Sequence, residues 1–539
     1  MRYLLLSALL GAAIPAASPT DPPSQPARDS AFHLLNRLAY GPTPGQIDAV
    51  AREGVLHWID RQLALGPRSD RNLRDRERSF PLLDTSTEDL GRMFLAARRE
   101  RKAARRDSIR THGEGGPMRA LASQLPRLAV LRADLAEHQL LEVMADFWTN
   151  HFNVFYGKAL DRVFLPDYIE STIRPHALGR FADLLLATAK SPAMLVYLDQ
   201  AQSIAPGSEP PGLRRLRGPG PRRWFSRRPE ADSMVSRIRN RMPTGINENY
   251  ARELLELHTL GVDGGYTQQD VIGVARILTG WSFDRGIRRG GTPGGFIFND
   301  WAHDRGAKQV LGIDFPAGHG RDEGERLLRA LADHPATMHH VSAKLCARLV
   351  ADESPDSCID LAVATWRRTH GDIAAIVRAI ALSPDFWSPR NVAAKVKTPL
   401  EFVVSALRAV GADPDTGGAA VAAIARLGQP LFLQSVPTGY PETQEDWVNS
   451  AALLARMNFA VALAGSRVPG VRIDLDRIAP SSADPDQWLE ALDRQILGGR
   501  MTGQTRSVIR AQVATVADPA AARALGLGLA LGSPEFQRQ

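Results

Sequence analysis

The sequence predicts an all-α protein with one small β excursion. Alanine, leucine and arginine are abundant, and these residues favour helices. Apolar residues recur at helical spacing through most of the chain, for example at Leu140, Val143, Met144 and Phe147. Strand-like alternation is confined to the region near 290–315. The 44% of hydrophobic and 23% of charged residues are ordinary values for a globular protein, so the fold class is a large, multi-helical, non-repeat one.

The first residues have the pattern of a secretory signal peptide. Arg2 supplies a positive charge, residues 4–12 are apolar, and Ala16, Ala17 and Ser18 are small residues that suit a signal peptidase. Residues 1–18 are therefore predicted to be a signal peptide and 19–28 a linker. No later segment reaches about 18 apolar residues in a row. We expect an exported protein without a transmembrane segment, in the periplasm or outside the cell.

Helices are predicted in close succession from residue 29 onwards. Ser30 is a capping residue before an apolar pattern, and Thr43 followed by Pro44 is a start signal for the next helix. The pattern over 118–150 is helical, with an expected break at Pro126. Further helices are expected over these ranges: 88–110, 164–174, 181–190 and 191–199.

A basic insertion separates these helices from the central stretch of the chain. Residues 200–243 are rich in proline, glycine and serine without periodicity, which predicts a disordered insertion. Ten arginines lie between Leu213 and Arg241 against two acids, so much of the formal net charge of +7 is local. Such a run is typical of a solvated loop or of a surface that attracts anionic polymers. Nucleic acid is an unlikely partner because export removes the chain from the genome.

Beyond residue 281 the pattern changes and then becomes helical again. The glycine-rich region 282–319 contains FIF (296–298) and KQVLGIDF (308–315), which alternate weakly and predict a small hairpin. Helices resume at Glu323, and a non-helical segment follows at 428–447. Since no repeat of fixed period is present, residues 29–535 are predicted to form a single large helical domain.

The chain has two cysteines, Cys346 and Cys358, on what read as consecutive helices. Two cysteines alone cannot form a zinc site. In an oxidising compartment they can form a disulfide, whose closure of this short loop would contribute about 2–3 kcal/mol. Two buried thiols are the alternative, and the sequence leaves both open.

The stretch 247–281 concentrates the candidate chemistry. Asn249, Arg252, Glu253 and Glu256 fall at i, i+3, i+4 and i+7 of a predicted helix, so they share one face. Two carboxylates beside an arginine can have different pKa values, one suited to an acid and one to a base. Glu253 is the acid/base candidate and Arg252 would orient an anionic group. The substrate-binding candidates here include Glu248.

Two simpler interpretations of this face stay open. Glu248 with Arg252, and Arg252 with Glu256, are i,i+4 pairs that on an exposed helix contribute about 0.3–0.5 kcal/mol each. Alternatively, these side chains form a buried polar network that joins helices without catalysis. Gly261 and the Thr267 capping box are expected to be structural, and His258 is expected to be a core residue.

Other candidate residues come from outside this helix. His303 and Asp304, with Lys308, lie in the least helical region, where sites tend to concentrate. Asn150 and His151 stand at a helix end. Trp281 is a candidate wall of a sugar-binding site. A composite site from His151, His258, His303 and Asp304 would suit zinc or another divalent metal, so a metal cofactor is one alternative and the cofactor is otherwise unknown.

Several blocks of the sequence resemble one bacterial family, domain of unknown function 1800. The blocks include DFWTNHFNVF (146–155), SPAMLVYLDQ (191–200), NENYARELLELHTLGVDGGYT (247–267), TPLEFVVSALRAVG (398–411) and LGQPLFLQSVPTGYP (427–441). The resemblance covers about 30–535 and implies an exported bacterial protein. It also implies a partner encoded nearby that looks like a sulfatase or phosphatase relative. Asp199 and Gln200 stand where an Asp-Asn pair is common, which makes Asp199 a substrate-binding candidate. The resemblance assigns no catalytic residues.

Two functions are consistent with the sequence. The first is a hydrolase or lyase that acts on a cell-envelope or extracellular polymer, or on an anionic small molecule, by carboxylate acid/base chemistry. Its catalytic candidates are Arg252, Glu253, Glu256, His151, His303 and Asp304. The second is a non-enzymatic periplasmic scaffold that binds the partner encoded nearby. The absence of a Gly-x-Ser-x-Gly motif and of a dinucleotide fingerprint excludes an α/β-hydrolase and a Rossmann enzyme.

Overall fold

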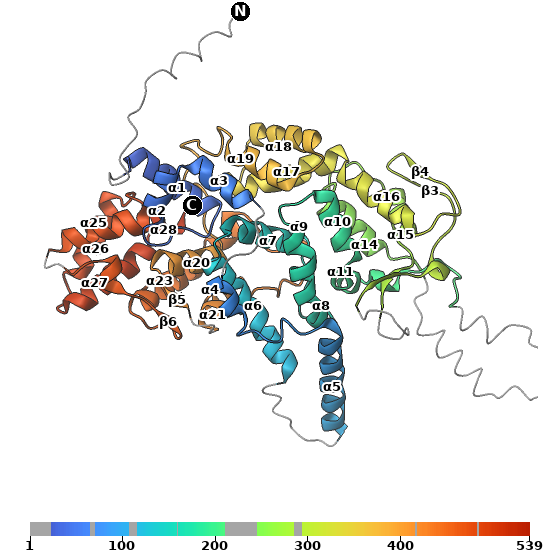
Figure 1. Cartoon of the computed structure of the whole chain (residues 1–539), viewed down its shortest axis with the longest axis horizontal. Coiled ribbons are helices and arrows are strands. Elements are labelled where there is room, and N and C mark those ends of the chain that lie inside the picture. The colour runs from blue at the N-terminus through green and yellow to red at the C-terminus, as the bar shows by residue number, and fades with distance from the viewer. Residues whose placement is uncertain are drawn as a thin grey trace, which may run out of the picture.

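The structure is a computed structural model that describes residues 23–64, 71–106, 116–158, 160–210, 245–284, 294–414, 418–481 and 484–539. It is mainly helical with a few short strands, which confirms the predicted fold class (Figure 1). The predicted signal peptide (1–18) and most of the arginine-rich insertion lie outside the described residues.

The N-terminal part of the chain forms the helices that surround α7 in Figure 1. Their bounds are α1 (Gln25–Arg37), α2 (Gln46–Glu53), α3 (Val55–Leu63), α4 (Arg71–Glu77), α5 (Thr87–Arg106), α6 (Pro117–Leu135), α7 (Gln139–His151), α8 (Asp161–Asp167), the π-helix η1 (Tyr168–Ile173), α9 (Arg174–His176), α10 (Phe181–Lys190), α11 (Pro192–Tyr197) and the 3₁₀ turn η2 (Gln200–Gln202).

The remaining helices run from the central stretch to the C-terminus. Their bounds are α14 (Glu248–Glu253), the π-helix η3 (Leu254–His258), α15 (Gln268–Ile277), η4 (Asp300–Ala302), α16 (Arg321–Ala332), α17 (Pro335–Leu349), α18 (Asp356–Thr369), α19 (Ile373–Ala381), α20 (Pro399–Ala409), α21 (Ala419–Arg426), α22 (Gln444–Trp447), α23 (Ser450–Ala464), α24 (Leu475–Ile478), α25 (Pro485–Leu492), η5 (Asp493–Leu497), α26 (Gly503–Val513), α27 (Pro519–Leu531) and α28 (Pro534–Gln537).

Several helix boundaries differ from the sequence prediction. The second helix begins at Gln46, after Gly45, and not at Thr43 and Pro44. The first helix begins at Gln25 rather than after Ser30. Pro26 lies in its first turn, where proline is favoured. Pro126 does not break α6, which is continuous from Pro117 to Leu135. The actual break comes at 136–138, before α7. A proline inside a helix removes one hydrogen bond, and packing of the buried neighbours Leu125 and Leu128 outweighs that loss.

In the part of the chain that the structure describes, the β structure consists of three two-stranded antiparallel ladders. Strand β2 (Phe296–Phe298) pairs with β1 (Trp281–Phe283), and β3 (Lys308–Val310) pairs with β4 (Ile313–Phe315). The small β excursion is therefore confirmed, but FIF does not pair with KQVLGIDF as the alternation suggested. Short alternating segments identify strands without identifying their partners. The third ladder joins β5 (Asp413–Pro414) to β6 (Val471–Arg472).

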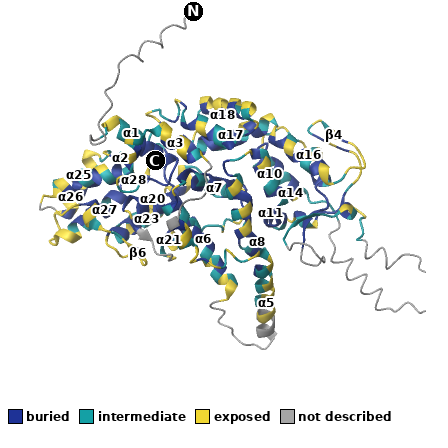
Figure 2. Ribbon diagram, in the orientation of Figure 1, coloured by how far each residue is buried: buried dark blue, intermediate teal, exposed yellow. Residues whose placement is uncertain are grey.

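Among the described residues, the core consists of two large apolar clusters and a third, small one around Phe80. The first contains side chains from α1 to α19, including Met144 and Phe147 of α7 and Leu345 of α17. The second contains side chains of the C-terminal helices, including Phe402 of α20. Figure 2 shows buried residues throughout both regions. Helix α7 contributes to both clusters, since its Val143 belongs to the second, so α7 lies where the two clusters meet.

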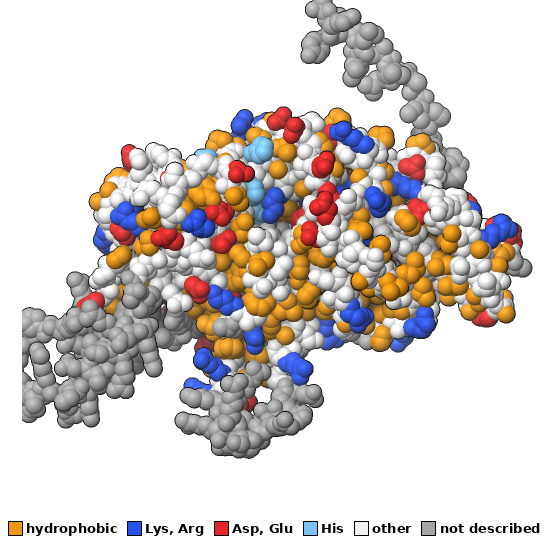
Figure 3. All heavy atoms as spheres, turned by 180° about the vertical axis from the view of Figure 1, so that it is seen from behind, with side chains coloured by type: hydrophobic (Ala, Val, Ile, Leu, Met, Phe, Trp, Pro, Cys, Tyr) orange, Lys and Arg blue, Asp and Glu red, His pale blue; other side chains and the backbone are white. Residues whose placement is uncertain are grey.

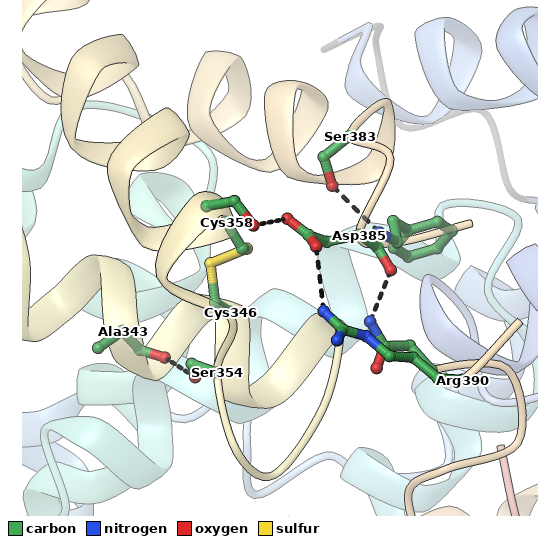
Figure 4. Close-up of a disulfide and its surroundings, with 10 residues drawn as sticks. Ala343, Cys346, Ser354, Cys358, Ser383, Asp385 and Arg390 are labelled. Atoms are coloured by element: carbon green, nitrogen blue, oxygen red, sulfur yellow. Dashed lines mark hydrogen bonds and ion pairs between the residues drawn. A yellow bond between two sulfur atoms is a disulfide. The ribbon is translucent and has the colours of Figure 1, made fainter. Parts of the chain in front are cut away.

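A disulfide joins Cys346 of α17 to Cys358 of α18 (Figure 4). Both cysteines are fully buried, and their Cα atoms are 6.2 Å apart, within the range that a disulfide spans. Around it, Ser357 donates to the Asp385 carboxylate over 2.6 Å and Ser354 donates to the Ala343 carbonyl over 2.9 Å. Of the two alternatives for the cysteines, the structure therefore contains the disulfide, and it fixes the C-terminal half of α17. Within the ranges described, no helix is both long and apolar enough to cross a membrane.

Candidate functional site

The predicted face at 249–256 forms a polar network at the surface. Asn247 caps α14 by accepting from the Tyr250 amide over 3.2 Å. Arg252 Nη1 lies 3.3 Å from Glu256 Oε1, and Arg252 Nη2 donates to Gln268 Oε1 over 2.7 Å. Gln268 in turn donates to Glu248, so Glu248 and Arg252 are linked through Gln268 rather than directly. Arg252 is 41% exposed and Asn249 is exposed, which fits the surface-pair interpretation.

Glu253 lies apart from this network. The chain changes from α-helix to π-helix after Glu253, so residues beyond it are shifted around the axis relative to a regular helix. Burial, and then the negative charge of Glu256, raise the pKa of Glu253. Burial raises the pKa of Tyr197 to about 12, and the charge of Glu253 adds to this shift. Glu253 is therefore close enough to Tyr197 of α11 for its charge to act on it, and it makes no ion pair with Arg252 within the described part of the chain.

The β region contacts its neighbouring helices through the side chains of His303, Asp304 and Lys308. His303 Nδ1 lies 3.0 Å from the Thr279 carbonyl, and its Nε2 lies 3.4 Å from Glu323 Oε2. Lys308 Nζ lies 2.6 Å from the same Glu323 oxygen, and all three side chains are buried. Asp304 accepts two hydrogen bonds from Arg276, at 2.8 and 3.1 Å. Burial alone would raise the pKa of Asp304, but Arg276 outweighs it and lowers the pKa.

Trp281 and Asp199 also make contacts that fit a structural role. Trp281 is 1% exposed and packs against Phe296, with ring centroids 5.0 Å apart, so it is not the wall of an open sugar site. Asp199 has a left-handed backbone with φ 59° and pairs with Lys158 over 2.9 Å. Asp199 remains 57% exposed.

His151 lies in a cluster with His258, His340 and Lys344, in which His151 and His258 are buried and the other two are partly buried. The ring of His151 lies 6.3 Å from that of His258 and 6.5 Å from that of His340. Burial lowers the pKa of His258 to about 3 and that of His340 to about 4. His258 is 2% exposed, as predicted for a core residue. Burial also lowers the pKa of Lys344.

The four residues of the predicted composite metal site do not come together. His151 and His258 are neighbours, whereas His303 and Asp304 contact Thr279, Glu323 and Arg276. In the part of the chain that the structure describes, no group of three or more His, Cys, Asp or Glu side chains is placed to hold a metal ion.

The other face of α7 lines a small cavity, which we call the chamber and whose lining includes Asp146, Asn150, Arg348, Phe432 and Glu442. Asn150 Nδ2 donates to the Tyr440 carbonyl over 2.8 Å and its Oδ1 accepts from the Tyr440 amide over 2.6 Å. Asn153 donates to the carbonyls of Gln434 and Val436. Gly439 permits this approach, since a Cβ there would lie 2.4 Å from the Asn150 carbonyl oxygen. The end of α7 thus holds the segment 434–442 against the chamber, whose volume is about 60 Å³.

Arg348 is the central charge of the chamber. It lies on α17 and is 4% exposed, and its guanidinium contacts three carboxylates from three parts of the chain. Nη2 lies 3.3 Å from Asp146 Oδ2 and 3.0 Å from Glu401 Oε1, and Nη1 lies 3.3 Å from Glu442 Oε2. Burial would lower the pKa of Arg348, but these carboxylates raise it. Lys344, one turn earlier on α17, also feels the charge of Glu442.

Two carboxyls that contact the Arg348 guanidinium have pKa values shifted in opposite directions. Burial raises the pKa of Asp146 to about 7, although Arg348 opposes the shift. Burial also acts on Glu401, but Arg348 and the Thr398 amide outweigh it and lower its pKa. The Asp146 side chain is 28% exposed, and Asp146 is among the lining residues of two small cavities. At neutral pH, Asp146 can therefore take up or release a proton while Glu401 stays ionised.

Phe432 separates the chamber from a larger groove. Its backbone has φ 62°, a left-handed conformation that is a genuine outlier for a bulky side chain. Its carbonyl accepts from the Tyr156 amide over 2.9 Å, which holds the strained segment in place. Leu431 and Phe432 line both the chamber and a groove of about 800 Å³. Strained residues of this kind cluster at functional sites.

The sequence interpretation found one edge of the chamber and missed its centre. Asn150 was a candidate, but Asp146, Arg348, Glu401 and Glu442 were not. Asp146 lies one helical turn before Asn150, and both belong to the block DFWTNHFNVF, which is the signal that could have found it. Glu401 belongs to the block TPLEFVVSALRAVG, where it reads as a capping-box residue and does form one. No local pattern marks Arg348.

The fold and the site define a large, mainly helical protein with a buried arginine–carboxylate centre. A model of the family described as protein of unknown function (DUF1800) matches residues 33–538. The chain belongs to this family, as the sequence blocks predicted. A comparison with curated proteins and a comparison with solved structures each gave no match.

Proposed function

We propose that the protein is an exported enzyme, a hydrolase or lyase, in which Asp146 transfers the proton. The observation that carries the proposal is a carboxyl with a pKa of about 7 beside a cavity. Acid/base catalysis is most efficient when the pKa of the group lies near the working pH. This moves the catalytic role from Glu253, the sequence-based candidate, to Asp146. The proposal assigns no catalytic role to four other sequence-based candidates, because each is bound to a neighbouring side chain outside the chamber. These are Arg252, Glu256, His303 and Asp304.

The charge balance of the chamber favours an uncharged polar group as the reacting part of the substrate. Arg348 already contacts three carboxylates, so it has little attraction left for an anionic group. The cavity of about 60 Å³ has room for a few waters or a small substituent. A hydroxyl, ether or amide group of a cell-envelope or extracellular polymer fits both conditions better than an anionic small molecule.

Two observations support export. Residues 1–18 have the pattern of a signal peptide. The buried disulfide between Cys346 and Cys358 is of the kind that forms in the periplasm or outside the cell.

The test is a screen of the purified protein on neutral polysaccharides and on isolated cell-wall sacculi. Hydrolysis is scored by new reducing ends, and cleavage without water by products that are one water lighter than the hydrolysis products in mass spectrometry. For any substrate that is turned over, Asp146→Asn should lower kcat by about 10²–10⁴-fold, the range of general acid/base catalysis. Glu253→Gln is the matched control and should retain activity. Loss of activity in Glu253→Gln but not in Asp146→Asn would return the role to Glu253.

A non-enzymatic scaffold is the second candidate function. The observation in its favour is that the carboxylates around Arg348 come from both parts of the core, as expected of a network that only holds them together. In that case the protein would turn over none of the substrates, and it would bind the sulfatase- or phosphatase-like partner encoded nearby. Co-purification with that partner, unchanged in Asp146→Asn, would support this candidate.

A further inference from the structure

The groove of about 800 Å³ next to the chamber has the size and lining of a ligand site. Its walls come from α5, α6, α21 and the segment 430–433, and they are mostly apolar. Met118 and Leu125 of α6 face Val421 and Ala425 of α21, with Phe432 between them. Figure 3 shows hydrophobic side chains spread over the lower half of the face seen from behind. Of the lining residues, Leu433 is 48% exposed, and exposed apolar surface of this kind is found at binding sites.

Two arginines border this groove without a carboxylate partner among the residues that the structure describes. Arg162 makes one long hydrogen bond, 3.4 Å to the Gly157 carbonyl, and its Nε is buried without a partner among the described residues. Its charge lies near the Tyr156 hydroxyl. Arg119 is exposed at the rim. Glu100 also borders the groove, but in the described part of the chain it pairs with neither arginine. A partly buried guanidinium that lacks a counter-ion leaves a place for an anion.

We propose that this groove binds an anionic amphiphile, with its hydrocarbon chain between α6 and α21 and its acidic group at Arg162. The apolar walls account for the chain, and the uncompensated cation accounts for the charge. An uncharged hydrocarbon would leave Arg162 without a partner, and a cationic one would be repelled. The inference does not depend on proton transfer at Asp146, because the groove and the chamber share only Leu431 and Phe432.

The test uses dodecanoate below its micelle concentration, with binding to the full chain measured by calorimetry. Saturable binding at one site is expected, and dodecyltrimethylammonium, which has the opposite charge, should bind at least 10-fold more weakly. Arg162→Gln should weaken dodecanoate binding by about 10–100-fold, the effect of losing a hydrogen bond between charged groups. Arg162→Lys should retain most of it.

A second pair of variants tests the location. Ala425→Trp fills the groove from α21 and should abolish binding, whereas Arg426→Gln, on the same helix but outside the groove, should bind as wild type does. Circular dichroism checks that Ala425→Trp is folded. Equal affinity for the two detergents, or unchanged binding in Arg162→Gln or in folded Ala425→Trp, would overturn the proposal. Binding to vesicles of anionic phospholipid without binding of monomeric dodecanoate would also overturn it, in favour of a membrane-surface site.

Discussion

Two arginine–carboxylate networks in this protein show how burial changes the meaning of the same residue types. Arg252 is 41% exposed and contacts one carboxylate, Glu256, at 3.3 Å. Arg348 is 4% exposed and contacts three carboxylates at 3.0–3.3 Å. In the sequence, the first network is conspicuous because its members are one helical turn apart. The second is invisible because its members are spread over about 300 residues. The second network lies around a cavity, and burial there raises the pKa of one of its carboxyls, Asp146, to about 7.

The largest expected difference between the networks is in stability. Arg348→Met removes the partner of three carboxylates and should lower the free energy of unfolding by about 3–5 kcal/mol, as breaking a buried ion pair does. Arg252→Met removes an exposed pair and should cost less than about 1 kcal/mol. Urea unfolding of both variants measures this. Equal losses would mean that the two networks do not differ in the way described.

The disulfide should contribute the next largest effect, because it ties down the helix that carries Arg348. Replacing both Cys346 and Cys358 by serine should lower the free energy of unfolding by about 2–3 kcal/mol, the value expected for a short loop. Thermal unfolding with and without a reductant measures this. The reductant should destabilise wild type and leave the double variant unchanged. A wild-type protein that is insensitive to reductant in the unfolding range would contradict the assignment.

A smaller effect is expected at the two asparagines. Asn150→Ala leaves the Tyr440 amide and carbonyl without their partner and should cost about 1–3 kcal/mol. Asn249→Ala changes an exposed side chain near the surface network and should cost less than about 0.5 kcal/mol. Melting temperatures of the two variants measure this. If Asn249→Ala is the more destabilising of the two, the segment 434–442 is not held by α7 as described.

The most subtle difference is in the pH dependence of stability. The folded pKa of Asp146, about 7, lies above its unfolded value of about 3.8, so the native state holds the extra proton between these values. Stability from this group is therefore full below about pH 4 and is lost as the pH rises towards 7. The free energy of unfolding of wild type relative to Asp146→Asn should fall across this range. A parallel slope in Asp146→Asn would contradict the shift.

The buried histidines should act on stability in the opposite direction. The folded pKa values of His258 and His340, about 3 and about 4, lie below the unfolded value of 6.5. The unfolded state therefore takes up protons first, so their contribution is lost as the pH falls from about 6.5. The difference in the free energy of unfolding between wild type and Asp146→Asn does not include the histidine contribution, because both proteins contain the same histidines.

Local features of the fold were predictable from the sequence, and the site was predictable only in part. The capping box at Thr267, the positive φ of Gly261 and the burial of His258 follow from local pattern, and the structure contains all three. The pairing of β1 with β2 and the contact of Arg348 with Asp146 depend on which distant segments meet, which helical periodicity does not encode. The same limit explains why Glu253 was chosen over Asp146. Spacing on one helix identifies a shared face, but the pKa shift depends on what covers that face.

The most direct test of the central claim is the titration of the Asp146 carboxyl itself. Infrared difference spectra of wild type minus Asp146→Asn isolate the carbonyl stretch of this one acid, and no substrate is needed. The account predicts a protonated-carboxyl band that disappears with a midpoint at about pH 7. A midpoint near pH 4, the ordinary value for an aspartic acid, would show that the chamber does not hold a proton at neutral pH and would contradict the proposed chemistry.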